Sequence, residues 1–192
     1  MSLYDTLSKA GFPQIRKNHN RVIQFIDTCS GWQDRDRVSS QQLLLALQQD
    51  KGRVNGRLFE FVQNRVNQWM PTTVITPRDD PLYNDVVLYA DSSEEVVLVK
   101  QTRYKELFYT YRNRLIHEFS RPGFGIDIFD DNQEPYYHSL MDGDEEKRLP
   151  WQLVFPVAFF HHICQTSLAG LEAHLRENNL NPYLSFEVSS KW

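Results

Sequence analysis

Apolar residues recur at steps of three and four along most of this chain, and this spacing constrains its fold more than any other feature. The longest stretch includes Leu107, Tyr111 and Leu115, which are four residues apart. Such spacing places the apolar side chains on one face of an α-helix and predicts a helix over residues 93–120. The same spacing predicts further helices over residues 3–10, 18–28, 41–49, 57–69 and 150–178. The sequence therefore predicts an all-α chain, folded as a helical bundle with little sheet.

A first interruption of the helical pattern lies in residues 71–92. This segment carries three prolines and is predicted to connect the N-terminal helices of residues 1–70 to the long helix at 93–120. Within it, residues 85–90 fit either a short strand or a turn of helix.

A second interruption, residues 121–149, is rich in acidic side chains. The alternating residues 124–129, a turn of Asp and Asn, and residues 135–138 predict a small β-hairpin or an ordered loop inserted between the two long helices. The last helix is expected to begin at Pro150 and to bend at Pro156.

Length and composition limit the classes of protein to which the chain can belong. Its 192 residues suffice for one domain with a sizeable core, and its net charge of −4 argues against a broad positive surface for duplex DNA. Cys29 and Cys164 are the only cysteines, and two isolated thiols fit a reducing cytoplasm. The most apolar stretch is too short to span a bilayer, and no secretion signal opens the chain. We therefore expect a single cytoplasmic domain, residues 1–192, with no membrane contact.

The end of the helix at 93–120 combines a fixed cation with a titratable imidazole. Arg112 precedes His117 by five positions, which in a helix corresponds to about 140° around the axis and about 7.5 Å along it. An arginine can hold a phosphate oxygen, and a histidine can move a proton near neutral pH. Alternatively, Arg112 pairs with a carboxylate such as Glu118, and His117 simply favours the C-terminal end of the helix dipole.

Arg112, Asn113 and His117 resemble the signature of the HEPN superfamily, in which an Arg followed by a polar residue precedes a His near the end of a core helix. Here Asn113 follows Arg112 directly, and four residues separate Arg112 from His117. The resemblance implies a helical bundle that dimerises and brings two copies of the motif into one cleft. Many members are endoribonucleases that need no metal ion. The resemblance assigns proton transfer to His117, the phosphate clamp to Arg112 and an orienting role to Asn113.

Further basic and aromatic residues accompany the motif. Between Lys100 and Arg121 the sequence has six basic residues and two acidic ones. Such a patch is typical of a small phosphate-binding surface, on which exposed tyrosines can stack unpaired bases. The predicted phosphate- and RNA-binding residues are Arg103, Lys105, Tyr109, Arg114 and Arg121. The alternative is that the tyrosines, including Tyr104 and Tyr111, face the core and that the cations are solvated.

No metal or cofactor site is predicted. His161 and His162 are adjacent on a predicted helix, so their side chains point about 100° apart and do not readily share one ion. The sequence leaves three hypotheses. The first is a dimeric, HEPN-like, metal-independent endoribonuclease, serving as a toxin or a phage-defence component with an antitoxin partner. The second is a HEPN-like module without activity that binds RNA, a nucleotide or a protein. The third is an unrelated helical interaction protein.

Overall fold

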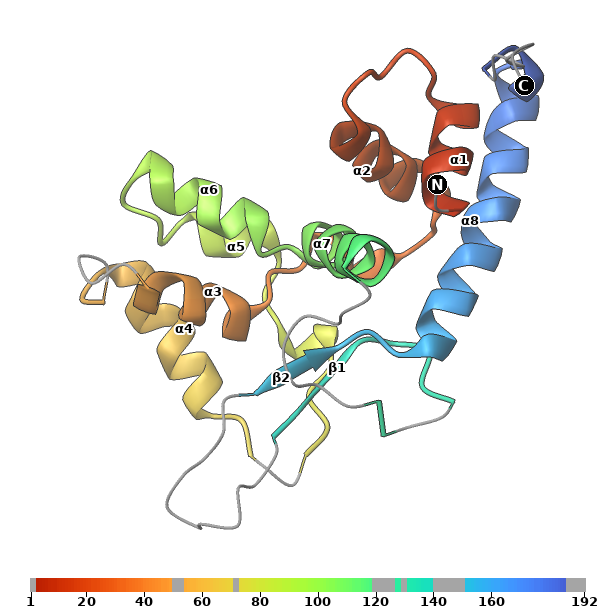
Figure 1. Cartoon of the computed structure of the whole chain (residues 1–192). Helices are drawn as coiled ribbons and strands as arrows, with labels where there is room; N and C mark the ends of the chain where they lie inside the picture. Colours follow the sequence, from red (N-terminus) through yellow and green to blue (C-terminus); the bar gives the residue numbers. More distant parts are fainter. Residues whose placement is uncertain are drawn as a thin grey trace. The chain divides into compact units, whose positions relative to one another are not determined.

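The computed structural model describes residues 3–49, 54–70, 73–118, 127–128, 131–139 and 151–185 (Figure 1). The chain is mostly helical, and one small sheet accompanies the helices. The α-helices are α1 (Leu3–Gly11), α2 (Asn18–Cys29), α3 (Ser40–Gln49), α4 (Arg57–Asn67), α5 (Tyr83–Val87), α6 (Ser93–Gln101), α7 (Tyr104–His117) and α8 (Val157–Glu177). Short 3-10 helices are η1 (Gln33–Asp36), η3 (Pro77–Asp79) and η4 (Pro182–Ser185). The strands are β1 (Tyr136–His138) and β2 (Gln152–Val154).

Contacts divide the chain into two compact units, which we describe separately. Unit 1 comprises Met1–Gln33 and Phe160–Trp192, and unit 2 comprises Asp34–Phe159. The sequence-based expectation of one domain over residues 1–192 stays a prediction. Among the described residues, no helix is both long enough and apolar enough to cross a membrane.

Unit 1 consists of α1, α2, most of α8 and η4. Val22, Phe25 and Ile26 on one side of α2 are fully buried, as their helical spacing predicts. The buried Tyr4 of α1 packs edge-on against Phe25, and its hydroxyl lies 3.1 Å from Ser167 Oγ of α8. The predicted helices at 3–10 and 18–28 are confirmed within one residue at each end.

Unit 2 contains the helices α3 to α7 and the sheet. Helix α3 packs against α4 (Figure 1), and both helices lie where the sequence predicts them. Residues 85–90, for which strand and helical turn were both open, contribute to the short helix α5. The core of this unit is formed by fully buried side chains, including Val38, Leu43, Leu47, Leu58, Val62, Val99, Tyr104, Phe108 and Tyr136.

The single helix predicted over 93–120 is wrong, because the structure breaks it into α6 and α7. The segment 37–39 runs beside the break. Ser39 donates its backbone N–H to the carbonyl of Thr102, and Tyr104 donates to the carbonyl of Arg37. Val38 and Arg103 form an isolated antiparallel bridge. These bonds hold Arg103 in an extended conformation, whereas the apolar spacing continues across the break.

The predicted hairpin is also corrected. β1 pairs antiparallel with β2, with Tyr137 opposite Leu153, so the partner of 135–138 comes from the segment assigned to the last helix. The predicted strand 124–129 lies largely outside the described residues, and the two described positions, 127–128, are not in a strand.

The last helix begins at Val157, after Pro156, rather than at residue 150. Proline disfavours the helical conformation in the residue before it, and Phe155 is accordingly not helical. The carboxylate of Asp127 accepts the backbone N–H of Val157, which satisfies a donor in the first turn of α8. Pro156 therefore precedes the helix and does not bend its interior.

Candidate functional site

Arg112, the arginine of the predicted motif, is held against its own helix. Its side chain is buried, with 4% of the residue exposed. Nη1 donates to Oδ1 of the neighbouring Asn113 at 2.6 Å, and the guanidinium carbon lies 5.6 Å from the centre of the Tyr109 ring. The structure thus brings together Arg112, Asn113 and Tyr109, and it fixes the guanidinium by these contacts.

Arg114 and His117 occupy a different position on α7. Both are exposed, and they lie three residues apart, which puts them on neighbouring positions of the last turn. Neither side chain has a hydrogen-bond or ion-pair partner among the residues that the structure describes. The helix ends directly after them, where the backbone N–H of Glu118 donates to the carbonyl of Arg114. The end of α7 therefore presents a guanidinium and an imidazole side by side, neither of them paired within the part of the chain that the structure describes.

Two of the cations predicted to bind phosphate are engaged elsewhere in unit 2. Arg103 contacts Asp36 Oδ1 at 3.2 Å and Glu106 Oε1 at 3.0 Å. Lys105 Nζ, which is buried, contacts the same Asp36 oxygen at 2.7 Å. Carboxylates within the unit thus balance these charges, and the structure does not bring the two residues into a free patch with Arg114. Arg121 lies outside the described residues.

A cavity of about 310 Å³ lies beside α7 within unit 2. It is lined by Leu107, Thr110, Tyr111 and Arg114 from α7, by Gln42 and Leu45 from α3, and by Gln152, Leu153 and Phe155 around β2. Tyr111 packs edge-on against Phe155, with ring centres 5.3 Å apart. Arg114 therefore lies at the meeting point of a partly apolar cavity and the exposed end of α7.

The other tyrosine considered for base stacking, Tyr104, is a core residue. Its hydroxyl oxygen lies 2.8 Å from Asp80 Oδ2 and 3.0 Å from the hydroxyl oxygen of Tyr137, within hydrogen-bond distance of both. Tyr137 is bonded to the same carboxylate oxygen and to Ser39 Oγ at 2.6 Å. Burial raises the pKa of both phenols well above the usual value, so both remain protonated donors. The alternative that this tyrosine faces the core is thus confirmed.

Asp80 is the centre of this buried network and is a residue that the sequence did not reveal. It is fully buried, and burial raises the pKa of its carboxyl to about 6, although hydrogen bonds from Ser40, Tyr104 and Tyr137 act in the opposite direction. Its segment was interpreted as a proline-rich connector. The only signal in the sequence was an Asp pair directly before Pro81.

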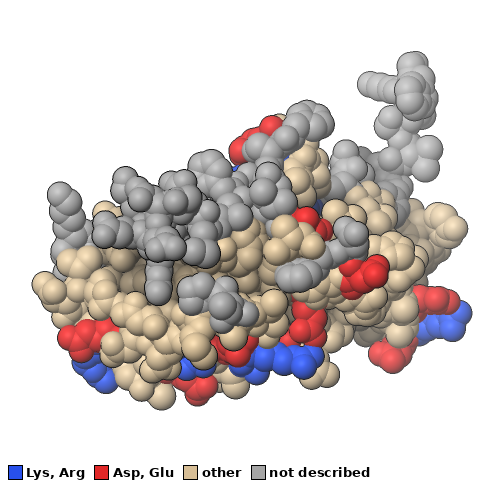
Figure 2. Space-filling model, turned by 90° about the horizontal axis from the view of Figure 1, so that it is seen from below, with Lys and Arg blue, Asp and Glu red and all other residues tan. Residues whose placement is uncertain are grey.

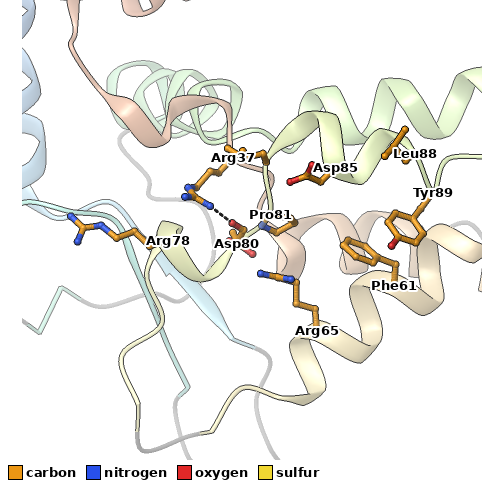
Figure 3. A pocket seen from close by; sticks show the side chains of 10 residues that line it. Arg37, Phe61, Arg65, Arg78, Asp80, Pro81, Asp85, Leu88 and Tyr89 are labelled. Carbon is orange, nitrogen blue, oxygen red and sulfur yellow. Dashed lines mark hydrogen bonds between the residues drawn. The ribbon is translucent and has the colours of Figure 1, made fainter.

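A second cavity, of about 470 Å³, lies next to this segment (Figure 3). It is lined by Arg37, Phe61, Arg65, Arg78, Asp80, Pro81, Leu82, Asp85, Leu88 and Tyr89. Sequence reasoning assigned no role to these residues, because they come from four separate segments that only the fold brings together.

Among the described residues, no group of three or more His, Cys, Asp or Glu side chains is arranged to hold a metal ion. Burial raises the pKa of the Cys29 thiol to about 11 and also raises that of Cys164. Thiols of this kind are poor nucleophiles at neutral pH, so neither is a candidate for covalent catalysis. His161 and His162 are both exposed on α8.

Comparison with family models, with curated proteins and with solved structures found no match for this chain.

Proposed function

We propose that this protein is a HEPN-like endoribonuclease that cleaves RNA without a metal ion at the C-terminal end of α7. The observation that supports the proposal is the pair formed by Arg114 and His117, which are exposed, adjacent and unpaired among the described residues. An accessible guanidinium can bind a phosphate oxygen, and an accessible imidazole can transfer a proton, and both actions assist phosphodiester cleavage by the RNA's own 2′-hydroxyl.

In this mechanism His117 takes the proton from a 2′-hydroxyl. The resulting oxygen attacks the adjacent phosphorus, the bond to the 5′-oxygen breaks, and that oxygen leaves with a proton. The products are a 2′,3′-cyclic phosphate end and a 5′-hydroxyl end. Arg114 binds a non-bridging phosphate oxygen and stabilises the added negative charge.

Arg112 has a different role in our proposal from the one that the HEPN resemblance assigns to it. Its burial and its hydrogen bond to Asn113 leave its guanidinium poorly exposed to a phosphate. We assign to Arg112 and Asn113 the positioning of the last turn of α7, and we transfer the phosphate contact to Arg114.

The substrate that fits this arrangement is unpaired RNA. The cavity beside Arg114 offers Tyr111 and Thr110 to a base that is free of Watson–Crick pairing. A base in this cavity would place its phosphate towards Arg114, at the edge of the cavity.

A homodimer would complete the chemistry. One imidazole cannot accept the 2′-hydroxyl proton and protonate the leaving oxygen at the same moment, because the two steps need opposite protonation states. His117 of a second copy would supply the acid. A toxin or phage-defence role, with an antitoxin as partner, belongs to the same proposal and rests on the family resemblance alone.

The burial of Arg112 favours one alternative, a HEPN-like module that binds RNA, a nucleotide or a protein without cutting RNA. In that case the motif arginine is structural, and the end of α7 is only a binding surface.

The first prediction separates these two functions. A mixed pool of end-labelled RNA is incubated in EDTA with wild type, His117→Ala, Arg114→Gln and the control His162→Ala, which removes an exposed histidine of α8. We expect wild type and the control to leave cyclic phosphate ends, and His117→Ala to lose cleavage by at least about 100-fold.

Oligomeric state and thermal unfolding are measured on the same samples. Cleavage that His117→Ala does not reduce would disprove the ribonuclease proposal. A folded wild-type dimer that binds the RNA pool but does not cut it would establish the binding module instead.

A further inference from the structure

The cavity next to Asp80 has a basic side formed by Arg65. The side chain of Arg65 donates through Nε and Nη2 to the backbone carbonyl of Asp79, at 3.1 and 2.8 Å. A carbonyl holds the guanidinium in place but does not neutralise it, and no described carboxylate forms an ion pair with Arg65. Its Nη1 is not used in these bonds. Arg65 is therefore a fixed cation in the wall of a cavity, with no carboxylate partner in the described ranges of the chain.

Arg37 adds a second anchored guanidinium. Its Nε contacts Asp34 Oδ1 at 2.7 Å, and its Nη1 donates to the backbone carbonyl of Asp80 at 2.6 Å (Figure 3). These bonds leave Nη2 unused. Arg78 is also ion-paired, with Glu134, but in Figure 3 its side chain extends away from Arg65. The anion-binding part of the cavity is thus formed by Arg65 with Arg37.

The other side of the cavity is apolar and continues onto the surface. The ring of Phe61 stacks on that of Tyr89 at 4.1 Å (Figure 3). At the rim, Leu82 is 49% exposed and Leu88 is 74% exposed. An anchored arginine and a tyrosine are residue types enriched at protein-binding surfaces, and the exposed leucines beside them add apolar area that a partner can cover. The apolar surface outside the cavity favours an extended ligand over a small molecule enclosed within it.

Asp85 narrows the choice of ligand. It lines the same cavity and has no side-chain partner among the described residues. Its carboxylate repels a doubly charged phosphate group, and it accepts hydrogen bonds from N–H groups. A ligand that carries one carboxylate and nearby amide N–H groups can pair with Arg65 and donate a hydrogen bond to Asp85. A peptide with an acidic side chain carries both kinds of group.

We propose that this cavity binds a segment of a partner protein in which an acidic side chain lies close to a large apolar one. The acidic group contacts Arg65 and Arg37, the apolar group packs against Phe61, Pro81 and Leu88, and a backbone N–H donates to Asp85. This site shares no lining residue with the cavity beside Arg114.

The second prediction tests this site with labelled synthetic peptides. Each peptide is acetylated and amidated and carries one Glu and one Leu, separated by zero to three alanines. A matched set replaces Glu with Gln, and another replaces Leu with Ala. In fluorescence anisotropy, we expect the best Glu peptide to bind about tenfold more tightly than its Gln counterpart, since hydrogen bonds to charged groups are the stronger ones.

Arg65→Gln keeps donors for the Asp79 carbonyl but removes the charge. We expect this variant to bind the Glu and Gln peptides equally. Arg176→Gln is the matched control, because Arg176 lies on α8, pairs with Glu172 and does not line the cavity. This control and Arg114→Gln should retain the tenfold preference for Glu.

The proposal is overturned if no peptide binds to wild type, or if folded Arg65→Gln keeps the preference for Glu. It is also overturned if the peptides in which Ala replaces Leu bind as tightly as the peptides that carry Leu. None of these results bears on RNA cleavage, which is measured separately with the His117 variant.

Discussion

At the scale of single residues, the buried carboxyl of Asp80 contributes a pH dependence to the stability of unit 2. A buried carboxyl with a raised pKa holds its proton more tightly in the folded than in the unfolded chain, where the usual value is 3.8. Stability from this group is therefore fully present below about pH 4, and it is lost as the pH rises through about 6. The direction is opposite to that of a carboxylate in a salt bridge.

The third prediction concerns Asp80→Asn, which keeps the size of the side chain but cannot titrate. Between pH 4 and pH 7, we expect the wild type to lose about 2 kcal/mol of unfolding free energy relative to this variant, because the folded pKa of about 6 lies about two units above the unfolded value. Urea unfolding of both proteins at several pH values measures the difference.

A second variant, Tyr137→Phe, removes a hydrogen bond that lowers the Asp80 pKa. This variant should raise the Asp80 pKa further, so the loss of stability should occur at a higher pH than in the wild type. If the unfolding free energies of wild type and Asp80→Asn changed with pH in the same way, the prediction would be contradicted.

The sequence predicted some of these residues and not others, for a physical reason. His117 and Arg114 are neighbours within one helix, so periodicity alone places them together. Asp80 and Arg65 acquire their surroundings from segments far away in the sequence, and no local pattern encodes that environment. Arg103 and Lys105 were assigned to RNA because they lie in a locally basic stretch, and their shared partner, Asp36, is distant in the sequence.

At the scale of elements, apolar spacing predicted where helices exist better than where they end. The α6–α7 break was missed because its cause is the segment 37–39, whose backbone bonds occupy Thr102 and Tyr104. β2 was missed because its residues, Gln152–Val154, fit the apolar spacing assigned to the last helix. Pro156 was predicted to bend the last helix, although proline is tolerated better at the start of a helix than in its interior.

Gly170 is an element-scale constraint in unit 1, because it allows α8 to approach the end of α2. A Cβ at this position would lie 2.1 Å from the backbone carbonyl oxygen of Cys29. Backbone atoms cannot rotate away as a flexible side chain can, so the two helices would have to separate.

The fourth prediction is that Gly170→Ala destabilises the protein by about 3 kcal/mol, despite the higher helix propensity of alanine. Thermal and urea unfolding measure the loss. Gln165→Ala, at an exposed position on the same helix, is the control and should change stability by less than about 0.5 kcal/mol. Equal stability of the two variants would show that α2 and α8 do not approach as closely as described.

At the scale of the whole molecule, the charge distribution limits how RNA can bind. The chain carries a net charge of −4. On the face drawn in Figure 2, the coloured side chains of the described residues form mixed groups of both signs. Long-range attraction of a polyanion is therefore weak, and binding must depend on a few local contacts.

The fifth prediction follows from this local binding. The affinity of His117→Ala for labelled single-stranded RNA should fall only gently as salt is added. A plot of the logarithm of the binding constant against the logarithm of the salt concentration should have a slope between roughly −1 and −2, as for two or three phosphate contacts. Introducing Arg114→Gln into the His117→Ala protein should reduce the magnitude of this slope by about 0.7, because one phosphate contact is removed.

Adding Arg65→Gln instead is the control and should leave the slope unchanged. A slope steeper than about −4 would mean that more than five phosphates are bound, in disagreement with a site confined to the end of α7.

The hydrogen bonds around Asp80 also have a consequence for the folding of unit 2. They join Ser39, Asp80, Tyr104 and Tyr137, and the Tyr137–Ser39 bond spans 98 positions. Helical proteins usually fold quickly because their contacts are local, whereas closing long loops costs entropy before any contact rewards it. The helices of unit 2 can form early, but its core cannot close until the chain has been synthesised past Tyr137. During translation, the polar groups of Asp80 and Tyr104 therefore lack their partner Tyr137 until more than thirty further residues have been added after Tyr104.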